Sequence, residues 1–436
     1  MNPPTVKPQP PVRDPLAQRA LAFLSDVLGN LRPRDFGIRL WDGSTLEPES
    51  GHSARFTLVL KHPGALRRMF LPATELTLRE AYIYDDFDVE GEMEAAFGLG
   101  TYLTGGTRSL AERLALGWRL LRLPRHHRPR TGRAGATLQG ERHSVERDQQ
   151  AVTYHYDVSN DFFSLWLGKR MVYSCAYFQS PEDDLDTAQE RKLEYVCRKL
   201  RLEKGERLLD IGCGWGGLVV YATEKYGVEA LGITLSRPQA ELATQTIRDR
   251  GLGDRCQVRV EDYRNVEERG GFDKLVSIGM FEHVGESRLP QYFQRAGRLL
   301  RPGGVFLNHG IGQTMGVRQR RGPSFSDRYV FPDGELLPIS TTLRVAEEQG
   351  LEVRDVESLR EHYALTLREW VRRLEAHHEE AVQATDETTY RTWRLFMSGS
   401  AYQFSSNEIN VYQSLLVKPE EGKSNLPLTR GDWYRE

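Results

Sequence analysis

The sequence lacks both long apolar segments and a strong excess of either charge. Lysine and arginine total 59 residues against 61 aspartates and glutamates in a chain of 436. A nucleic-acid-binding protein usually carries a basic excess, so this near balance argues against nucleic acid as a partner. No apolar run approaches the roughly 20 residues that a helix needs to cross a bilayer. Any membrane contact is therefore expected to be peripheral.

Cysteine is scarce, and neither a secretion signal nor an internal repeat is recognisable. The four cysteines have neither the paired spacing of a metal site nor that of a disulfide framework. We therefore expect reduced thiols, no bound metal and a cytoplasmic protein. Residues 1–12, MNPPTVKPQPPV, are rich in proline and lack the apolar core of a secretion signal. The cysteines are Cys175, Cys197, Cys213 and Cys256.

The length of the chain favours more than one domain. Residues 15–30 have the pattern of an amphipathic helix, and strand-like segments follow at 37–41 and 54–60. Helical patterning covers much of 66–99, which completes a small α+β domain. The predicted parts are an N-terminal domain, a basic linker, a larger domain and a loose C-terminal tail, over residues 1–120, 121–150, 151–418 and 419–436.

Residues 119–147 are rich in arginine, histidine and glycine and poor in apolar side chains. One interpretation is a solvated linker, to which His126 and His127 belong. The other is a basic element that docks on anionic lipid, where each cation near the surface contributes about 1 kcal/mol. The apolar side chains beside this element are Leu114, Trp118, Leu120 and Leu121.

From residue 151 onward, strand-like and helix-like segments alternate, which predicts an α/β domain with a doubly wound parallel sheet. The expected strands are 206–211, 228–233, 256–260, 272–278 and 304–308. The expected helices among them are 184–200, 216–226, 237–250 and 288–300. A helical region at 341–348, 363–384 and 388–399 and a strand at 410–418 follow.

The stretch ERLLDIGCGWGG at 206–217 predicts a buried strand that runs into a glycine loop at the start of a helix. Gly212, Gly214 and Gly217 allow the backbone to approach a ligand closely, and the N–H groups of the helix can face a polar or anionic group. Such a loop is typical of a nucleotide-type cofactor, or of a tight turn without a ligand.

Two cofactors fit this loop. A dehydrogenase needs an acid at the end of the second strand, but that strand ends in Thr234 and Leu235. Arg237 could hold a 2′-phosphate, so an NADP-dependent oxidoreductase stays open. Asp210 lies where S-adenosylmethionine sites place a carboxylate near the amino-acid end of that cofactor, and Asp262 is placed for its adenine edge. These two carboxylates favour S-adenosylmethionine.

Eight motifs occur in order along the chain: YHYDVSNDFF (154–163), MVYSCAYF (171–178), LLDIGCGWGG (208–217), GITLSRPQ (232–239), EDYR (261–264), SIGMFEHVG (277–285), LNHGIG (307–312) and YVFPDGELLP (329–338). Together they resemble cyclopropane-fatty-acyl-phospholipid synthases, mycolic acid cyclopropane synthases and related fatty-acid methyltransferases. The resemblance covers nearly all of 150–418 and implies a Rossmann-like class I methyltransferase domain. The N-terminal region is similar to the extra domain of the bacterial phospholipid enzymes.

The resemblance implies addition of a methylene from S-adenosylmethionine across a cis double bond of an unsaturated phospholipid acyl chain at the membrane surface. An alkene is a weak, neutral nucleophile, so positioning supplies much of the rate. The carbocation that forms needs a dry site and aromatic faces, for which Tyr156 and Trp215 are candidates. In the family, a bicarbonate ion then removes a proton from the transferred methyl. The phospholipid enzymes of the family are often dimers, which implies a homodimer by analogy.

Alignment with the family's motifs implies the site residues. Bicarbonate would be held by Cys175, Glu282, His309, the backbone of Ile311 and Tyr363. S-adenosylmethionine would be surrounded by Tyr173, Ser174, Asp210, Gly212, Gly214, Trp215, Thr234, Leu235, Gln239, Asp262 and Tyr263. His377 and His378 match no motif and are interpreted as part of a solvated helix face.

Glu146, just before the first motif, leaves the product open. An extra carboxylate near the cation would favour loss of a different proton, which gives a methylene- or methyl-branched chain in place of the ring. A surface charge in the basic linker is the other interpretation of this residue. Retention of the bicarbonate positions favours the ring. A non-catalytic lipid-binding module is a further alternative, but it leaves the glycine loop without a role.

Overall fold

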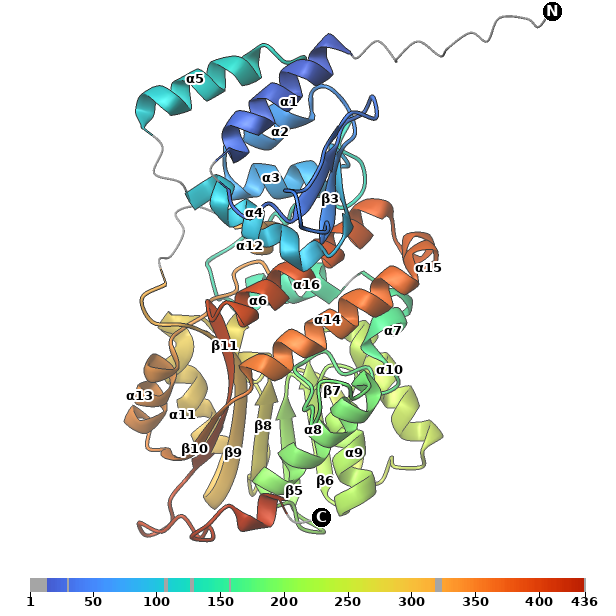
Figure 1. Ribbon diagram of the computed structural model, residues 1–436. Coiled ribbons are helices and arrows are strands. Elements are labelled where there is room, and N and C mark those ends of the chain that lie inside the picture. Colours follow the sequence, from blue (N-terminus) through green and yellow to red (C-terminus); the bar gives the residue numbers. More distant parts are fainter. Residues whose placement is uncertain are drawn as a thin grey trace, which may run out of the picture. The chain divides into compact units, whose positions relative to one another are not determined.

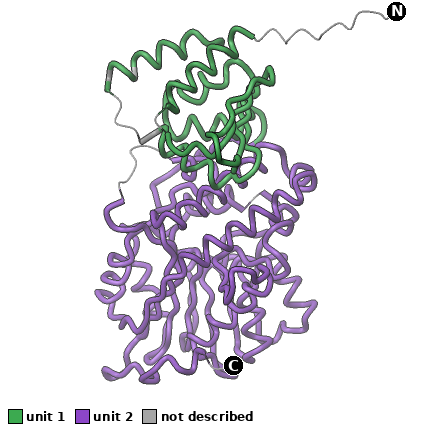
Figure 2. The backbone as a smooth tube through the Cα atoms, in the orientation of Figure 1, with its two compact units in different colours: residues 1–132 green, residues 133–436 purple. Residues whose placement is uncertain are grey.

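The computed structural model describes residues 14–29, 31–105, 109–125, 129–156, 158–317 and 324–434. The chain divides into two compact units, residues 1–132 and 133–436 (Figure 2). The segment predicted as a basic linker, 121–150, therefore crosses the boundary. Beyond the boundary it is anchored: Arg133 Nε donates to the carbonyl of Tyr329 at 3.0 Å, and Arg147 Nε donates to Asp333 Oδ2 at 2.5 Å. Residues 133–150 thus belong to the second unit.

The first unit is a small α+β fold. Its strands are β1 (Phe36–Arg39), β2 (Thr45–Leu46), β3 (Phe56–Leu60) and β4 (Phe87–Gly91), in the spatial order β2-β1-β3-β4. Its helices are α1 (Pro15–Leu28), α2 (Ala65–Phe70), α3 (Glu75–Ile83), α4 (Met93–Gly105) and α5 (Leu110–Leu121). Helix α1 begins where the Asp14 side chain accepts the N–H of Leu16, which satisfies one of the free donors of the first turn.

The second unit is built around one large sheet (Figure 1). In the described residues its strands are β5 (Arg207–Ile211), β6 (Glu229–Thr234), β7 (Cys256–Val260), β8 (Phe272–Ile278), β9 (Leu300–Gln313), β10 (Glu352–Ser358) and β11 (Ile409–Val417). Their spatial order is β10-β11-β9-β8-β5-β6-β7. Strands β5 to β9 are parallel neighbours, whereas β11 runs antiparallel to both β9 and β10.

The helices of the second unit surround this sheet. Before the sheet come α6 (Val145–Tyr156), α7 (Asn160–Leu167) and α8 (Leu185–Leu200). Within the parallel part lie α9 (Gly217–Tyr226), α10 (Arg237–Asp249), the short η1 (Phe281–His283) and η2 (Glu286–Arg288), and α11 (Leu289–Leu299). Then follow α12 (Phe325–Tyr329), α13 (Ile339–Glu348), α14 (Arg360–Ala376), α15 (His378–Ala384), α16 (Glu387–Ser405) and η3 (Gly431–Tyr434).

Both faces of the central strand β5 are buried. Leu208 belongs to a core that includes side chains of α8 and α9. Its neighbours Leu209 and Ile211 belong to a second core with side chains of α11 and α13. Successive side chains of a strand point to opposite faces, so the apolar side chains of β5 need cover on both sides. Helices on both faces of a parallel sheet define the doubly wound architecture, and the predicted fold class is confirmed.

In the second unit, the predicted strands from 206–211 to 272–278 and the helices among them agree with the structure within a residue at each end. In the first unit, the strands expected at 37–41 and 54–60 are β1 and β3, whose ends differ by up to two residues. The larger differences lie later in the chain. The strand expected at 304–308 is the longer β9, because β11 pairs with it from Val305 to Gln313. The helix expected at 363–384 is interrupted at His377. The tail expected to be loose carries the buried Trp433, and Arg201 Nε donates to Asp432 at 2.6 Å.

Candidate active site

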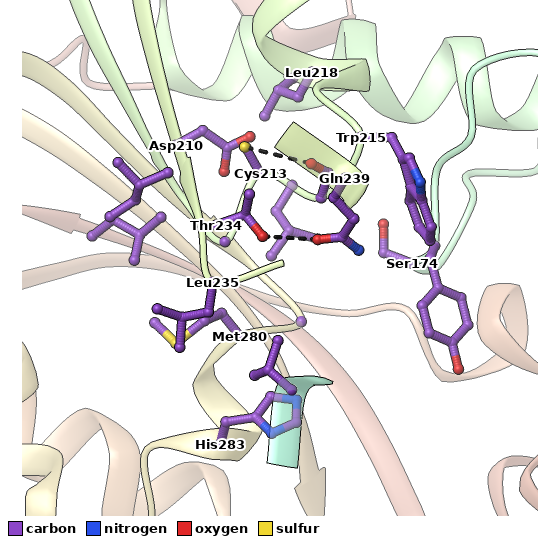
Figure 3. A pocket seen from close by; sticks show the side chains of 18 of the residues that line it. Ser174, Asp210, Cys213, Trp215, Leu218, Thr234, Leu235, Gln239, Met280 and His283 are labelled. Carbon is purple, nitrogen blue, oxygen red and sulfur yellow. Dashed lines mark hydrogen bonds between the residues drawn. The ribbon is translucent and has the colours of Figure 1, made fainter. Parts of the chain in front are cut away.

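A pocket lies at the carboxyl ends of β5, β6 and β8 (Figure 3). Ligands bind at this edge of open α/β sheets, where loops and helix N-termini converge. Tyr156 lines the pocket, and so does every residue that the family's motifs assign to S-adenosylmethionine. Those residues are Tyr173, Ser174, Asp210, Gly212, Gly214, Trp215, Thr234, Leu235, Gln239, Asp262 and Tyr263.

The glycine loop brings backbone to the wall of the pocket. Gly212 has φ of +85°, and a Cβ added there would lie 2.7 Å from the Cβ of Met280. Gly214 has φ of +55° with open space beside it. Side chains are rarely tolerated in this part of conformational space, so the loop requires glycine. Helix α9 begins at Gly217, another lining residue, and its N-terminal N–H groups are therefore close to a bound ligand.

Asp210 and Lys192 are two buried ionisable residues that line the pocket. Burial raises the pKa of the Asp210 carboxyl to about 7, although the Lys192 ammonium acts against this rise. Asp210 Oδ1 is buried without a hydrogen-bond partner among the described residues. Burial lowers the pKa of Lys192 to about 8, and its Nζ donates to Ser174 Oγ at 3.1 Å. The two groups suit the ammonium and the carboxylate of an amino-acid moiety.

Sequence reasoning missed Lys192. The residue lies on α8 between Ala188 and Val196, at the four-residue spacing of the buried stripe of that helix. A lysine is almost never fully buried without a partner or a function. The helical pattern of 184–200 places Lys192 among buried positions, so the sequence could have indicated a functional lysine there. Only the fold shows that this lysine lines the pocket.

The end of β6 supplies a polar but uncharged wall. Thr234 Oγ1 donates to Gln239 Oε1 at 2.8 Å (Figure 3). This bond leaves Gln239 Nε2 buried without a partner among the described residues, so it can donate to a ligand. Arg237, the residue that would hold a 2′-phosphate, is exposed and does not appear among the side chains lining the pocket.

Asp262 follows the end of β7 and lines the pocket, where its carboxylate is ion-paired with Arg264. Arg264 Nη2 donates to Asp262 Oδ2 at 2.6 Å and to Asp148 Oδ2 at 2.9 Å. Both Arg264 and Asp148 line the pocket, and neither was identified from the sequence. Arg264 thus connects the strand end to α6. The remaining lone pairs of Asp262 are the acceptors available to a ligand.

Aromatic rings line one side of the pocket. The rings of Tyr156 and Trp215 meet edge to face with centroids 5.9 Å apart, and Tyr156 and Tyr173 do so at 6.4 Å. Trp215 Nε1 donates to Asn160 Oδ1 at 2.8 Å, which fixes the indole. The geometry therefore provides rings at the positions where the sequence analysis expected contacts to a cation.

The residues expected to bind bicarbonate form a second cluster, outside the lining of this pocket. None of them lines the pocket, although their neighbours Ser174 and His283 do. Glu282, in η1, is buried, and its Oε1 accepts the backbone N–H of Ile311 at 2.7 Å. Its Oε2 has no partner among the described residues, and burial raises its pKa to about 7. The Ile311 amide, expected to face the anion, is thus occupied by Glu282.

His309, on β9, is a second member of this cluster. Its Nδ1 lies 3.2 Å from Gln413 Nε2, whereas its Nε2 is buried without a partner in the described part of the chain. Burial lowers the pKa of His309 to about 3, and the ammonium groups of Lys192 and Lys199 lower it further. The ring is therefore neutral near pH 7, with one nitrogen available to the site.

Cys175 and Tyr363 complete the cluster. Burial raises the pKa of the Cys175 thiol, so it stays an S–H donor, and its Sγ lies 3.3 Å from the Ala176 carbonyl. Burial also raises the pKa of Tyr363, and charge on Cys175 or Glu282 raises it further. The cluster therefore combines neutral donors with one carboxyl that can gain or lose a proton near neutral pH.

Three other sequence hypotheses have a clear structural outcome. Glu146 is exposed on α6 and does not line the pocket, which agrees with a surface charge. His378 is exposed and bonds Glu387 at 2.9 Å, as expected for a solvated helix face, whereas His377 is half-buried and bonds the Arg373 carbonyl. His126 and His127 lie outside the described residues.

Comparison with known proteins agrees with this geometry. The family model described as mycolic acid cyclopropane synthetase matches residues 143–414. A "probable fatty acid methyltransferase" of Pseudomonas putida is 40% identical over 91% of this chain and 96% of its own length. The cyclopropane-fatty-acyl-phospholipid synthase of Escherichia coli K12 is 34% identical over 69% of this chain and 75% of its own. The structure of mycolic acid cyclopropane synthase CmaA1 complexed with SAH and CTAB has a TM-score of 0.59 and 35% identity, over 62% of this chain and 97% of that one.

The fold and the pocket define a class I methyltransferase that uses S-adenosylmethionine. The chain belongs to the mycolic acid cyclopropane synthetase family. It is accordingly a C-methyltransferase of fatty acyl chains, and this assignment replaces the alternatives of an NADP-dependent oxidoreductase and a non-catalytic module.

Proposed function

We propose that this enzyme forms cyclopropane rings in the unsaturated acyl chains of phospholipids. The observation that carries the proposal is that the two sites adjoin: Cys175 and Glu282 are the immediate chain neighbours of Ser174 and His283, which line the donor pocket. Methyl transfer breaks the bond from carbon to sulfur and forms a bond to one alkene carbon. The ring closes when the transferred methyl loses a proton and bonds to the other alkene carbon. The reaction thus needs a donor site and a proton-accepting site close together.

The aromatic side of the pocket supports the cationic stage of this reaction. Tyr156 and Trp215 present rings that can stabilise positive charge without reacting with it. Burial raises the pKa of Tyr156, so its hydroxyl stays protonated. Neither ring supplies a nucleophile that would capture the carbocation.

The second cluster fits a small anion. Glu282 Oε2 and His309 Nε2 are buried without partners among the described residues, and each needs a hydrogen-bonding partner. Bicarbonate bound there would supply the base that accepts the methyl proton. Glu282, with a pKa of about 7, can donate to an anion in its protonated form. Cys175 and Tyr363 add neutral donors, and Ile311 acts through Glu282.

A helix of the first unit supports a membrane-bound substrate. On α5, Leu114, Trp118 and Leu121 are exposed by 66%, 57% and 54%, and their spacing places them on one face. The guanidinium of Arg122 lies 3.3 Å from the ring centroid of Trp118. Apolar side chains beside arginine suit the interface of an anionic membrane. Within the described residues, no helix has the length and apolar character of a bilayer span.

A branched product is the second candidate. The relative from Pseudomonas putida, which matches almost the whole chain, is named a fatty acid methyltransferase and not a cyclopropane synthase. The exposed position of Glu146 does not support a role for that carboxylate in choosing this product.

Vesicles of dioleoyl phosphatidylglycerol with S-adenosylmethionine test the proposal. We expect each modified chain to gain the mass of one CH2 group and to show the upfield proton resonances of a cyclopropane ring. An exocyclic methylene resonance, or a methyl branch, would instead establish the second candidate. The matched control is a vesicle of saturated lipid, which offers no alkene and should gain no mass.

A further inference from the structure

The two ring nitrogens of His309 have different surroundings. Nδ1 lies 3.2 Å from Gln413 Nε2, and Nε2 has no partner among the described residues. A neutral imidazole carries its proton on one nitrogen only. Which nitrogen carries it decides whether His309 offers the buried cluster a donor or an acceptor.

The partners of Gln413 determine the orientation of its side-chain amide. Its Oε1 lies 2.8 Å from Lys199 Nζ, and a lysine ammonium donates hydrogen bonds without accepting any. The amide oxygen of Gln413 must therefore face Lys199, and its NH2 group must face His309. Lys199 is also ion-paired with Glu357; burial lowers the pKa of the Lys199 ammonium, and the charge on Glu357 opposes this lowering.

Strand register places these groups in one row. Gln413 on β11 is directly opposite His309 on β9 and directly opposite Glu357 on β10. Directly opposite residues project from the same face of a sheet, so the three side chains lie next to one another. Gln413, Lys199 and His309 are all buried, and water therefore does not compete for these hydrogen bonds.

We propose that Gln413, oriented by Lys199, is a positioning residue that holds neutral His309 in the tautomer protonated at Nε2. The Gln413 NH2 group donates to Nδ1, so the ring proton resides on Nε2, the nitrogen that is available to the cluster. The opposite tautomer would place two donors against each other and leave a bare lone pair at Nε2. His309 thereby presents an N–H to an anion and not a competing base. The catalytic consequence, but not the tautomer itself, rests on the proposed function.

His155 provides an internal comparison. Its Nδ1 lies 2.7 Å from the carbonyl oxygen of Val330, which can only accept, so His155 carries its proton on Nδ1. Burial lowers the pKa of His155 well below its usual value, so this ring is neutral as well. The structure thus contains two buried neutral histidines whose partners demand opposite tautomers.

Nitrogen NMR of the full chain with labelled histidine rings tests the assignment. There are 11 histidines, and the signals of His309 and His155 are assigned from variants that lack each ring. We expect two-bond couplings typical of the Nε2-protonated form for His309 and of the Nδ1-protonated form for His155. Finding His309 protonated at Nδ1 would overturn the proposal, and this measurement needs no variant of Gln413.

Gln413→Glu tests the consequence. A carboxylate facing Nδ1 demands a proton there, so the His309 signal should move to the Nδ1-protonated or doubly protonated form. Turnover on oleoyl vesicles should fall by roughly 100-fold, the loss that follows removal of one donor from a reaction site, while affinity for S-adenosylhomocysteine is retained. Gln257→Glu is the matched control, because Gln257 is exposed on β7 and its Oε1 accepts from Arg259, as a glutamate would.

The two proposals fail in different ways. An unchanged His309 signal and unchanged turnover in Gln413→Glu would refute the role of Gln413. A wild-type chain with the Nε2-protonated signal but no lipid product would refute the proposed function and leave the tautomer assignment standing.

Discussion

The backbone N–H of Ile311 donates to Oε1 of Glu282 at 2.7 Å, while the other oxygen of this carboxylate is buried without a partner among the described residues. The bond joins the turn after β8 to the neighbouring strand β9. It fixes the direction of Oε2, the atom that would face the anion of the proposed function. One oxygen of the carboxyl is thus held by the backbone, and the other is available to a ligand.

Glu282→Gln should lose turnover and keep the fold. A glutamine can still accept the Ile311 N–H, but it cannot exchange a proton at the second position. We expect roughly a 100-fold loss of activity on oleoyl vesicles, in the range of general acid–base contributions. Calorimetry with S-adenosylhomocysteine should show unchanged affinity. The control is Glu286→Gln, an exposed residue of η2, and equal activity of the two variants would contradict the role of Glu282.

Donor affinity should rise with pH through the titration of Asp210. The pKa of this carboxyl is raised to about 7 by burial, so it is largely neutral at lower pH and charged above. The charged form attracts the ammonium of the donor's amino-acid moiety. S-adenosylhomocysteine should therefore bind more tightly at about pH 7.5 than at about pH 6. Asp210→Asn should remove this rise, and Asp254→Asn, at an exposed position, should retain it.

The same affinity should fall again at alkaline pH because of Lys192. Its pKa is lowered to about 8 by burial, and above this value the ammonium loses the charge that attracts the donor's carboxylate. The affinity profile is therefore bell-shaped. Lys192→Met should weaken binding at neutral pH and abolish the alkaline decline, whereas Lys204→Met, at an exposed site, should leave the profile intact. An alkaline decline that persists in Lys192→Met would assign it to another group.

Removing apolar side chains from α5 should weaken binding to anionic vesicles. Leu114 and Trp118 are exposed, and burying such side chains in an interface contributes about 1 to 2 kcal/mol each. The double variant Leu114→Ser, Trp118→Ser should therefore sediment with vesicles at least roughly tenfold more weakly. Met315→Ser is the matched control, because Met315 is an exposed apolar residue of the second unit. Equal binding of both variants would exclude α5 as the lipid contact.

Trp433→Ala should destabilise the second unit. The indole is buried, and the Arg201 guanidinium lies 5.2 Å from its ring centroid. Loss of a buried aromatic side chain typically costs about 3 kcal/mol or more of the free energy of unfolding. Urea denaturation followed by tryptophan fluorescence measures this loss. Tyr434→Ala, next to it but largely exposed, should cost much less, and an equal cost would mean that the C-terminal segment is not docked as the structure shows.

Local sequence patterns predicted most of the second unit. Two features depend only on residues a few positions apart: the alternation of strand-like and helix-like segments, and the glycine loop. The sequence therefore predicts both of them. The paired residues Thr234 and Gln239 are of this kind, since a strand end and the following helix bring them together. The sequence did not predict that residues 133–150 belong to the second unit. Arg147, for example, bonds Asp333, which lies almost two hundred residues further along the chain.

The sequence by itself determined the class of fold and many of the residues around the donor pocket, because these follow from short motifs in a fixed order, but it did not indicate Lys192, Arg264 or Asp148. Only the tertiary structure decided how the buried groups are paired. Glu282 takes the amide of Ile311, Lys192 lies against Ser174, and Gln413 faces His309 across two strands. Such pairings depend on strand register and on burial, which determine the hydrogen-bond partner and the protonation state of each group. The spacing of residues along the chain predicts neither the register nor the burial.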